Sequence, residues 1–358
     1  MKAAGIARAR LSNQLLGSTK RRKPGEVVAW LGAMQAQDFA AAKWAVGLRT
    51  YEATDTDVEA AFNEGRILRT HVMRPTWHFV APKDIRSLLA LTAARVHQTS
   101  GRVYRRLGFD GPLLNRCHRL LSQALRDRTF LTRAELAGRL RAHRIEADGL
   151  RLAYLLMHAE LEGLICSGPR QGKQFTYALL DERAPPARML RGDEALRDWT
   201  LRYFTGHGPA QVKDFAWWSG LTTEQARRGL ELAASKLTSD VSEGNTYWFA
   251  PDSAPSVPPA PNAWLLSIYD EYTIAYGDRS VLGNRPAFQR LLSIGPAMPA
   301  VLIVDGTLAG TWRRVVGTET VEIRMKLFRP LGRSERRAVA AAAGRYGAFL
   351  GLKSLVST

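Results

Sequence analysis

Two glutamines separated by one alanine are the residues of this chain whose type and spacing best suit chemistry. Gln35 and Gln37 lie in the stretch Met34-Gln-Ala-Gln-Asp38. A glutamine carbonyl accepts a hydrogen bond from water and presents the negative end of its dipole to a developing positive charge. Glutamine is not a strong base, so the pair can orient a water molecule and stabilise a cation without removing a proton itself.

The backbone conformation decides whether the two amides can act together. Side chains two positions apart point to different sides of a helix, whereas in an extended or turn segment they point to the same side. Helical patterns flank the stretch and Asp38 can cap the second helix, so both glutamines can project from the connecting loop. The spacing by itself favours a plainer role, because glutamines near helix ends usually cap the helix or face solvent.

Other residues that often carry chemistry form no recognised motif. Cys117 and Cys166 lack Cys-x-x-Cys spacing, and we interpret both as buried apolar residues. The seven histidines include no His-Glu-x-x-His pattern, and no Gly-rich phosphate loop follows a strand pattern. We therefore expect no metal site and no cofactor.

The net charge is the strongest signal in the composition. The 358 residues contain 51 Lys and Arg against 33 Asp and Glu, a formal charge of +18. This excess indicates a polyanionic partner, usually nucleic acid, although a basic surface kept for solubility or an Ala- and Arg-rich proteome would give the same balance. No apolar run approaches about 18 residues and residues 1–14 lack a secretory apolar block, so we expect no membrane contact and a cytoplasmic, nucleoid-associated protein.

The glutamine stretch lies in a predicted unit of helices followed by a hairpin. Apolar spacing predicts helices at 5–17, 24–34, 39–48 and from a cap at Thr56 to Phe62. The β-like runs 67–72 and 76–80 flank Met73-Arg74-Pro75 and predict a hairpin. Helices followed by a β-hairpin are the layout of a winged helix.

The same layout returns twice. The second copy has helices at 111–127, after the Thr132–Glu135 capping box and at 150–164, and a hairpin at 164–167 and 175–180. The third has helices at 194–204, 209–218 and 223–234, and a wing at 237–241 and 246–249. We expect winged-helix domains at 1–108, 109–190 and 191–252; their repetition is architectural rather than residue for residue.

A change of character follows the Pro-rich stretch 251–262, which we interpret as a linker. The expected domain 263–358 has strands at 264–269, 300–305, 307–313 and 320–328 and a closing helix at 333–349. This pattern predicts a small β-barrel or sheet. The fold class expected for the whole chain is α+β, with tandem winged helices and a C-terminal small β-barrel.

Gln35-Ala36-Gln37-Asp38, within an N-terminal winged helix, resembles the catalytic motif of the bacterial AlkZ/YcaQ-type family of winged-helix DNA glycosylases. In that family two polar residues separated by one aliphatic residue form the motif, and two glutamines mark the AlkZ branch. Longer stretches at 69–78, 269–279 and 305–312 also resemble the family, so the resemblance extends over most of the chain.

The resemblance implies a C-shaped, monomeric protein that encloses double-stranded DNA. It also implies a monofunctional DNA glycosylase that hydrolyses the N-glycosidic bond of N7- or N3-alkylated purines, including bulky natural-product adducts and interstrand crosslinks. Such an enzyme would serve DNA repair or, in a producer of a genotoxic antibiotic, self-resistance.

The proposed substrates fit an amide pair. A purine alkylated at N7 or N3 is cationic and leaves as a neutral base, so no general acid is needed. The transition state resembles an oxocarbenium ion, and Gln35 and Gln37 would orient water and stabilise that cation. Neutral lesions such as uracil should not be excised.

Further residues are candidates for support and binding. Asp38 would cap a helix or add to the local electric field of the site. His78 would satisfy a backbone carbonyl or reach DNA. Tyr269, Asp270 and Arg279 would form either a buried polar support for the site or an internal ion pair. Basic residues that could meet phosphate are Lys20, Arg21, Arg22, Lys23, Arg74, Arg170, Lys173, Arg313 and Arg314. Arg313 and Arg314 precede a Gly-Thr-Glu-Thr turn, so they could lie on a hairpin that enters a groove.

The chief alternative is a non-catalytic winged-helix transcription regulator, because winged helices bind DNA more often than they cleave glycosidic bonds. A regulator should prefer a palindromic sequence and form a dimer, and no dimerisation helix is evident. An RNA-binding or structural chromatin protein also fits the charge, but it leaves the glutamine pair unexplained.

Overall fold

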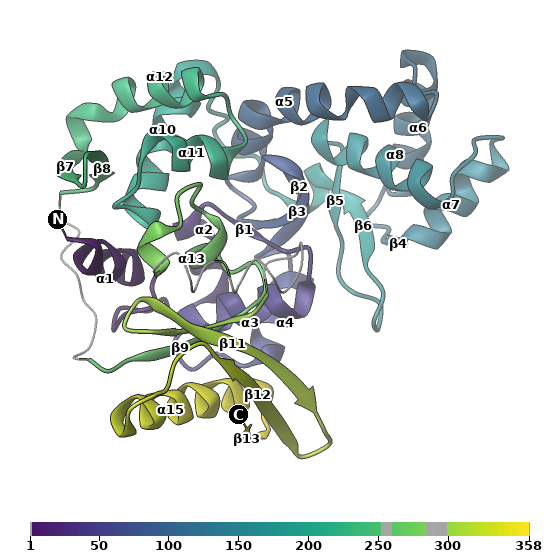
Figure 1. The fold of residues 1–358 in the computed structure, drawn as a ribbon. Coiled ribbons are helices and arrows are strands. Elements are labelled where there is room, and N and C mark those ends of the chain that lie inside the picture. Colours follow the sequence, from purple (N-terminus) through teal and green to yellow (C-terminus); the bar gives the residue numbers. More distant parts are fainter. Residues whose placement is uncertain (1, 252–259, 284–288, 290–298, 358) are drawn as a thin grey trace.

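The computed structural model describes residues 2–251, 260–283, 289 and 299–357, and the fold is a mixed α+β arrangement (Figure 1). Residues 252–259 of the expected linker lie outside the described residues. Within the described part of the chain, no helix is both long and apolar enough to cross a membrane.

The first part of the chain combines helices with a small antiparallel sheet of order β1-β3-β2. Its elements are α1 (Ala3–Asn13), α2 (Pro24–Leu31), β1 (Ala33–Gln35), α3 (Phe39–Arg49), α4 (Asp55–Asn63), β2 (Leu68–Val72) and β3 (Arg74–Val80). The predicted hairpin around Met73 is therefore confirmed. The cap of α4 is Thr54 and not Thr56, because the Thr54 hydroxyl accepts from the backbone N–H of Asp57.

The helix expected over 24–34 ends early, at Leu31. Gly32 has a φ of 79°, a backbone conformation that stops the helix and turns the chain into β1. A side chain at this position would also be crowded, since an added Cβ would lie 2.8 Å from the Trp199 ring. The consequence is that Gln35 belongs to a strand rather than to a loop.

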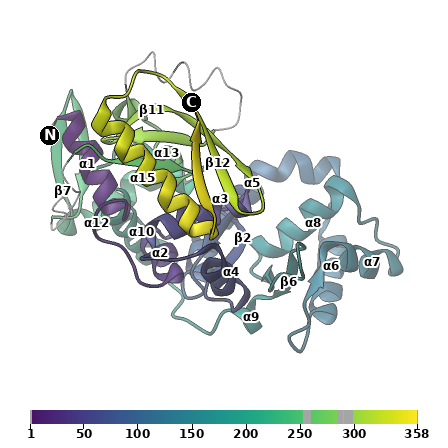
Figure 2. The same ribbon diagram turned by 90° about the horizontal axis from the view of Figure 1, so that it is seen from below.

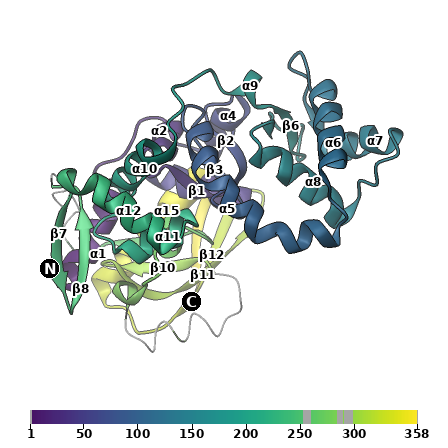
Figure 3. The same ribbon diagram turned by 90° about the horizontal axis from the view of Figure 1, so that it is seen from above.

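The second part of the chain has its own apolar core, which includes Leu121, Leu136 and Leu155. Its residues Met157 and Leu161 also pack in a cluster shared with the first part. In Figures 1 and 3 its helices lie on the opposite side of the molecule from β7 and β8. The long helix α5 (Ile85–Arg106) leads to it, and its elements are α6 (Gly111–Ala124), β4 (Leu131–Thr132), α7 (Arg133–Ala142), α8 (Gly149–Leu161), β5 (Ile165–Ser167), β6 (Thr176–Leu179) and α9 (Leu180–Arg183). The predicted capping box is confirmed: the backbone N–H of Glu135 donates to the Thr132 hydroxyl, and the Glu135 carboxylate accepts from the backbone N–H of Thr132.

The third group of helices packs on the first part rather than forming a separate core. Trp199, Tyr203 and Trp218 share one buried cluster with Leu68 and Val80 of the β2–β3 hairpin. The elements are α10 (Gly192–His207), α11 (Val212–Ser219), α12 (Thr223–Ala233), β7 (Thr238–Ser242) and β8 (Asn245–Phe249). This shared core fixes α11 beside the sheet that contains Gln35.

The C-terminal part is a curled, open sheet of order β13-β12-β11-β10-β9. Figure 2 shows α15 (Arg333–Leu350) lying along it, and α15 contacts both edge strands. The strands are β9 (Ala263–Leu266), β10 (Val301–Val304), β11 (Thr307–Val316), β12 (Thr320–Leu327) and β13 (Lys353–Ser357), and the short helix α13 (Glu271–Ile274) follows β9.

Of the small barrel or sheet that the sequence predicts, the described residues form a curled sheet and not a closed barrel. The edge strands β9 and β13 do not pair with each other, and helices cover the sheet instead. Trp44 of α3 packs against Tyr346 and Phe349 of α15, with ring centres 4.8 and 5.1 Å apart. One apolar cluster therefore joins the first part of the chain to the C-terminal sheet.

Candidate active site

The Gln-Ala-Gln stretch is extended, as its predicted role requires. β1 pairs with β3 so that Gln35 lies opposite His78, and the backbone N–H of Ala36 continues the pairing by donating to Trp77 O over 2.7 Å. Asp38 then begins α3, because its Oδ1 accepts from the backbone N–H of Ala41 over 2.9 Å. The predicted cap at Asp38 is confirmed.

The side chain of Gln35 shares a face of the sheet with residues of β3. Paired residues project from the same face of a sheet, so Gln35 is half-buried on the side that carries Arg74, Thr76 and His78. Gln37 is exposed, and its Oε1 lies 3.5 Å from the backbone nitrogen of Trp77. The two amides therefore lie beside neighbouring residues of β3, Gln35 at His78 and Gln37 at Trp77.

Buried polar atoms without partners gather on this face. Arg74 Nη2, Thr76 Oγ1 and His78 Nε2 have no hydrogen-bond partner among the described residues. Most buried polar atoms in proteins are paired, so three such atoms on one strand are unusual. This cluster can supply both donors and acceptors to a bound polar group.

The imidazole of His78 is neutral and its orientation is fixed. Its Nδ1 lies 2.9 Å from Thr76 O and is assigned as the donor to that carbonyl. Burial lowers the pKa of His78 well below its ordinary value, and the positive charge of Arg74 lowers it further. His78 thus satisfies a backbone carbonyl, one of its two expected roles, while Nε2 is left as an acceptor.

Glu271 is a site residue that the sequence reasoning missed. Its side chain is buried; Oε1 accepts from the backbone N–H of Gln35 over 3.0 Å, and Oε2 accepts from the Trp218 indole over 3.2 Å. Burial lowers the pKa of Arg74, and the charge of Glu271 opposes that change. A sequence signal existed, since Asp270-Glu271 is an acidic pair within an apolar run, but it did not identify a partner.

Arg69 is a second missed residue. Its guanidinium lies between the rings of Trp77 and Phe175, 4.2 and 4.6 Å from their centres, and its Nε donates to the carbonyl of Ala36 over 2.9 Å. Burial lowers the pKa of Arg69 to about 10, so it is charged at neutral pH. Arg69 therefore holds the residue between the two glutamines.

Tyr269, Asp270 and Arg279 do not form one polar cluster. Asp270 is fully buried and pairs through both oxygens with Arg49, over 2.7 and 2.8 Å. Arg279 instead donates to Thr273 O, and Tyr269 adopts a φ of 60° between β9 and α13. Asp270 therefore takes part in an internal ion pair, but its cation is Arg49 and not Arg279.

The basic run from Lys20 to Lys23 lies at the far end of α3 from the glutamines. The backbone N–H of Arg21 donates to Arg49 O at the C-terminus of that helix, whereas Asp38 caps its N-terminus. A helix of 11 residues is about 16 Å long. Arg22 and Lys23 are exposed, but burial lowers the pKa of Lys20.

The other predicted phosphate contacts differ in exposure. Arg74 is largely buried. Arg170 pairs with Glu59 over 3.0 Å and stacks between Phe39 and Phe175, so it is occupied within the protein. Lys173, at the turn between β5 and β6, is exposed, as are Arg313 and Arg314 of β11; Arg314 also donates to the Tyr346 hydroxyl.

Comparisons with known proteins identify the family and the fold of this chain. The family described as "DNA glycosylase AlkZ-like" matches residues 28–349. The interstrand DNA cross-link repair glycosylase of Streptomyces sahachiroi is 24% identical over 320 residues, 86% of each chain. The solved structure of Streptomyces sahachiroi DNA glycosylase AlkZ has a TM-score of 0.84 and 22% identity over 100% of both chains, which shows a common fold. Because the family match spans most of the sequence, this chain belongs to the AlkZ-like family of DNA glycosylases.

Proposed function

We propose that the chain hydrolyses the N-glycosidic bond of N7- or N3-alkylated purines in double-stranded DNA, with Gln35 and Gln37 as its catalytic residues. The observation that supports this most is the extended Gln-Ala-Gln stretch paired with β3, beside the unpartnered polar atoms of Arg74, Thr76 and His78. The amide oxygens would orient water toward the anomeric carbon and stabilise the oxocarbenium-like state. A cationic purine needs no general acid to leave.

The rigidity of the stretch supports the same role. Its backbone is held by Glu271 at the Gln35 N–H, by Trp77 at the Ala36 N–H and by Arg69 at the Ala36 carbonyl. Groups fixed before the reaction lose little entropy and undergo little reorganisation in the transition state. Glu271 and Arg69 are positioning residues in this proposal, and Asp38 supports the site by capping α3.

The proposed architecture has three winged-helix domains, at 1–108, 109–190 and 191–252, and a C-terminal half-barrel at 263–358. The protein would act as a C-shaped monomer on nucleoid DNA. Each of the first three parts contains a β-hairpin that follows helices, at β2–β3, β5–β6 and β7–β8. Exposed basic residues at Lys173, Arg313 and Arg314 would contact phosphate.

The proposed lesions include bulky adducts and interstrand crosslinks, and the Streptomyces sahachiroi relative is described as an interstrand DNA cross-link repair glycosylase. A crosslinked base cannot be rotated fully into a tight pocket. The β11–β12 hairpin, with the exposed Arg313 on β11, would hold the duplex while the glutamines reach the sugar. A role in self-resistance of an antibiotic producer would follow from the same activity.

The test is base release from a duplex that carries a single N7-alkylguanine. We expect wild-type protein to release the base and Gln35→Ala and Gln37→Ala to lose about 10²–10³-fold in rate. Gln123→Ala, at an exposed position on α6, is the matched control and should act like wild type. Uracil should not be released.

Two results would contradict the proposal. Full activity in either folded glutamine variant would remove that residue from the mechanism. Tight binding to a palindromic duplex, with no release of N7-alkylguanine or of a bulky adduct, would favour the transcription regulator instead.

A further inference from the structure

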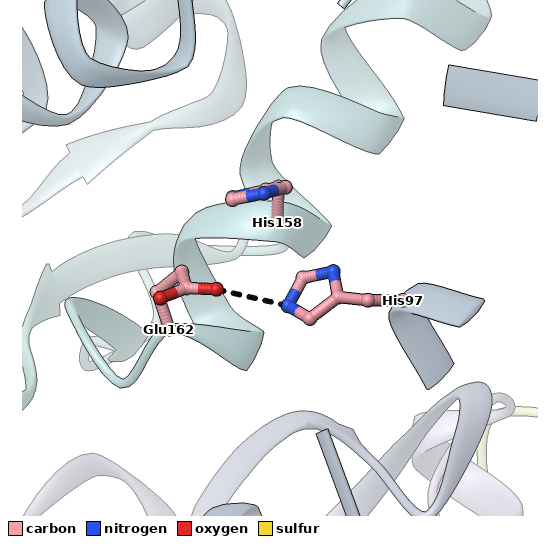
Figure 4. A group of neighbouring side chains, drawn as sticks. All are labelled: His97, His158 and Glu162. Carbon is pink, nitrogen blue, oxygen red and sulfur yellow. Dashed lines mark ion pairs between the residues drawn. The ribbon is translucent and has the colours of Figure 1, made fainter. Parts of the chain in front are cut away.

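Three histidines and a glutamate lie close together where the helices α5, α6 and α8 meet. His97 lies on α5, His118 on α6 and His158 on α8, and Glu162 directly follows α8. Figure 4 shows the side chains of His97 and Glu162 directed toward each other, with His158 next to them. His97 is twelve residues beyond Ile85, about 18 Å along α5, and the cluster contains none of the residues of the candidate active site.

The spacing of this cluster suits a metal ion. One candidate ligand atom each from His97, His158 and Glu162 lies within 4.8 Å of the other two, and His97 Nε2 is 3.0 Å from Glu162 Oε1. His158 and Glu162 are four residues apart and so share one side of the α8 segment. His97 Nε2 is buried, and despite the short distance it has no well-aligned hydrogen-bond partner among the described residues.

Neighbouring groups leave the two imidazoles ready to bind a cation. His97 Nδ1 lies 3.0 Å from the Tyr104 hydroxyl, and His158 Nδ1 lies 3.2 Å from His118 Nε2. If each Nδ1 carries the proton, each Nε2 presents a lone pair.

We propose that His97, His158 and Glu162 bind a divalent transition-metal ion such as Zn²⁺, and that Tyr104 and His118 orient the two imidazoles. Imidazole and carboxylate are common ligands of Zn²⁺, and water would complete a tetrahedral site. With bonds of about 2.0–2.1 Å, the ligand atoms would lie about 3.3 Å apart. The side chains must therefore move closer together, which the half-exposed Glu162 permits.

The bound ion would clamp α5 to the second part of the chain. α5 leads from the β2–β3 hairpin into α6, and His158 and Glu162 belong to the unit that carries Lys173. The role is structural, because the ion would join α5 to α8 and neither helix carries Gln35 or Gln37. Sequence motifs gave no indication of it, since His97 lies on α5, about 60 residues before His158 and Glu162.

The experiment is calorimetric titration of ZnCl₂ into the full chain after treatment with a chelator. We expect one Zn²⁺ per chain and a higher unfolding temperature in its presence. His97→Gln and His158→Gln should each weaken binding more than about tenfold, and His118→Gln by about tenfold. His143→Gln changes an exposed histidine and should have no effect. The two cysteines are buried and should not compete.

Two further measurements keep the test decisive. Co²⁺ added in place of Zn²⁺ should give the visible absorption of a four-coordinate ion. Glu162→Gln changes an exposed residue, so it should weaken Zn²⁺ binding even if the histidine variants fold poorly. Equal Zn²⁺ affinity in wild type and in His97→Gln, His158→Gln and Glu162→Gln would overturn the proposal. Release of N7-alkylguanine should proceed without metal, so this result is independent of the proposed catalytic function.

Discussion

The backbone N–H of Gln35 donates a hydrogen bond to Oε1 of Glu271, a residue 236 positions further along the chain, over 3.0 Å. The second oxygen of the same carboxylate accepts from the Trp218 indole. Three segments of the chain, β1, α11 and α13, therefore meet at one buried side chain. The position of the glutamine stretch depends on the C-terminal part of the fold as well as on its own sheet.

Glu271→Gln should slow base release without weakening DNA binding. An amide has one acceptor oxygen, so either the Gln35 N–H or the Trp218 indole will face an NH₂ group. We expect the single-turnover rate to fall by about 10–100-fold and the free energy of unfolding to fall by about 1–3 kcal/mol. Quenched-flow excision, duplex binding and urea denaturation measure the three quantities.

Trp218→Phe is the matched control for Glu271. It removes the indole donor but keeps the hydrogen bond to Gln35, so it should lower stability while the excision rate stays close to wild type. If both variants slowed excision equally, Glu271 would act through general packing and not by positioning Gln35.

Asp270→Asn should destabilise the protein more than it affects the chemistry. Asp270 and Arg49 are both fully buried, and removal of one charge leaves the other without compensation. The expected loss in the free energy of unfolding is about 3–5 kcal/mol. Asp181→Asn, which removes an exposed partner of Arg86, should cost about 0–1 kcal/mol. A stable but inactive Asp270→Asn protein would instead place this carboxylate in the active site.

Local signals in the sequence predicted much of the fold. The caps at Asp38 and Thr132 depend on side chains within three residues, and the hairpin at Met73 lies between two clear β-like runs. Such features need no information from distant parts of the chain.

Features that depend on distant partners were missed or wrong. β1 is a strand only because β3 pairs with it, and the open C-terminal sheet depends on α3 and α15 covering it. Glu271 and the Arg49–Asp270 pair were missed for the same reason. Sequence reasoning found the two glutamines but not the residues that hold them.

Lys173 and Arg170 should behave differently although both are basic and close in sequence. Lys173 is exposed, so Lys173→Ala should weaken duplex binding and reduce the slope of log affinity against log salt by about one. Arg170 pairs with Glu59 and stacks on two phenylalanines, so Arg170→Ala should chiefly lower stability. Fluorescence anisotropy at several salt concentrations, with thermal unfolding in parallel, separates the effects. A salt slope that changes for Arg170→Ala and not for Lys173→Ala would reverse this assignment.

The stability of the protein should fall as the pH drops below about 6.5, and His78 should contribute to the fall. Burial, with the positive charge of Arg74 on the same strand, keeps the folded-state pKa of His78 well below its ordinary value. The unfolded chain takes up a proton near pH 6.5 that folded His78 does not, so stability is present above that pH and is lost toward lower pH.

The slope from one such group approaches about 1.4 kcal/mol per pH unit. The test is to compare wild type with His78→Gln by urea denaturation from pH 7.5 to pH 5. Contributions from the other buried histidines cancel in the difference, and the variant should have the flatter profile. His143→Gln, at an exposed histidine, should keep the wild-type slope. Parallel profiles for wild type and His78→Gln would mean that folded His78 takes up its proton at the same pH as the unfolded chain, which would contradict a pKa lowered by burial.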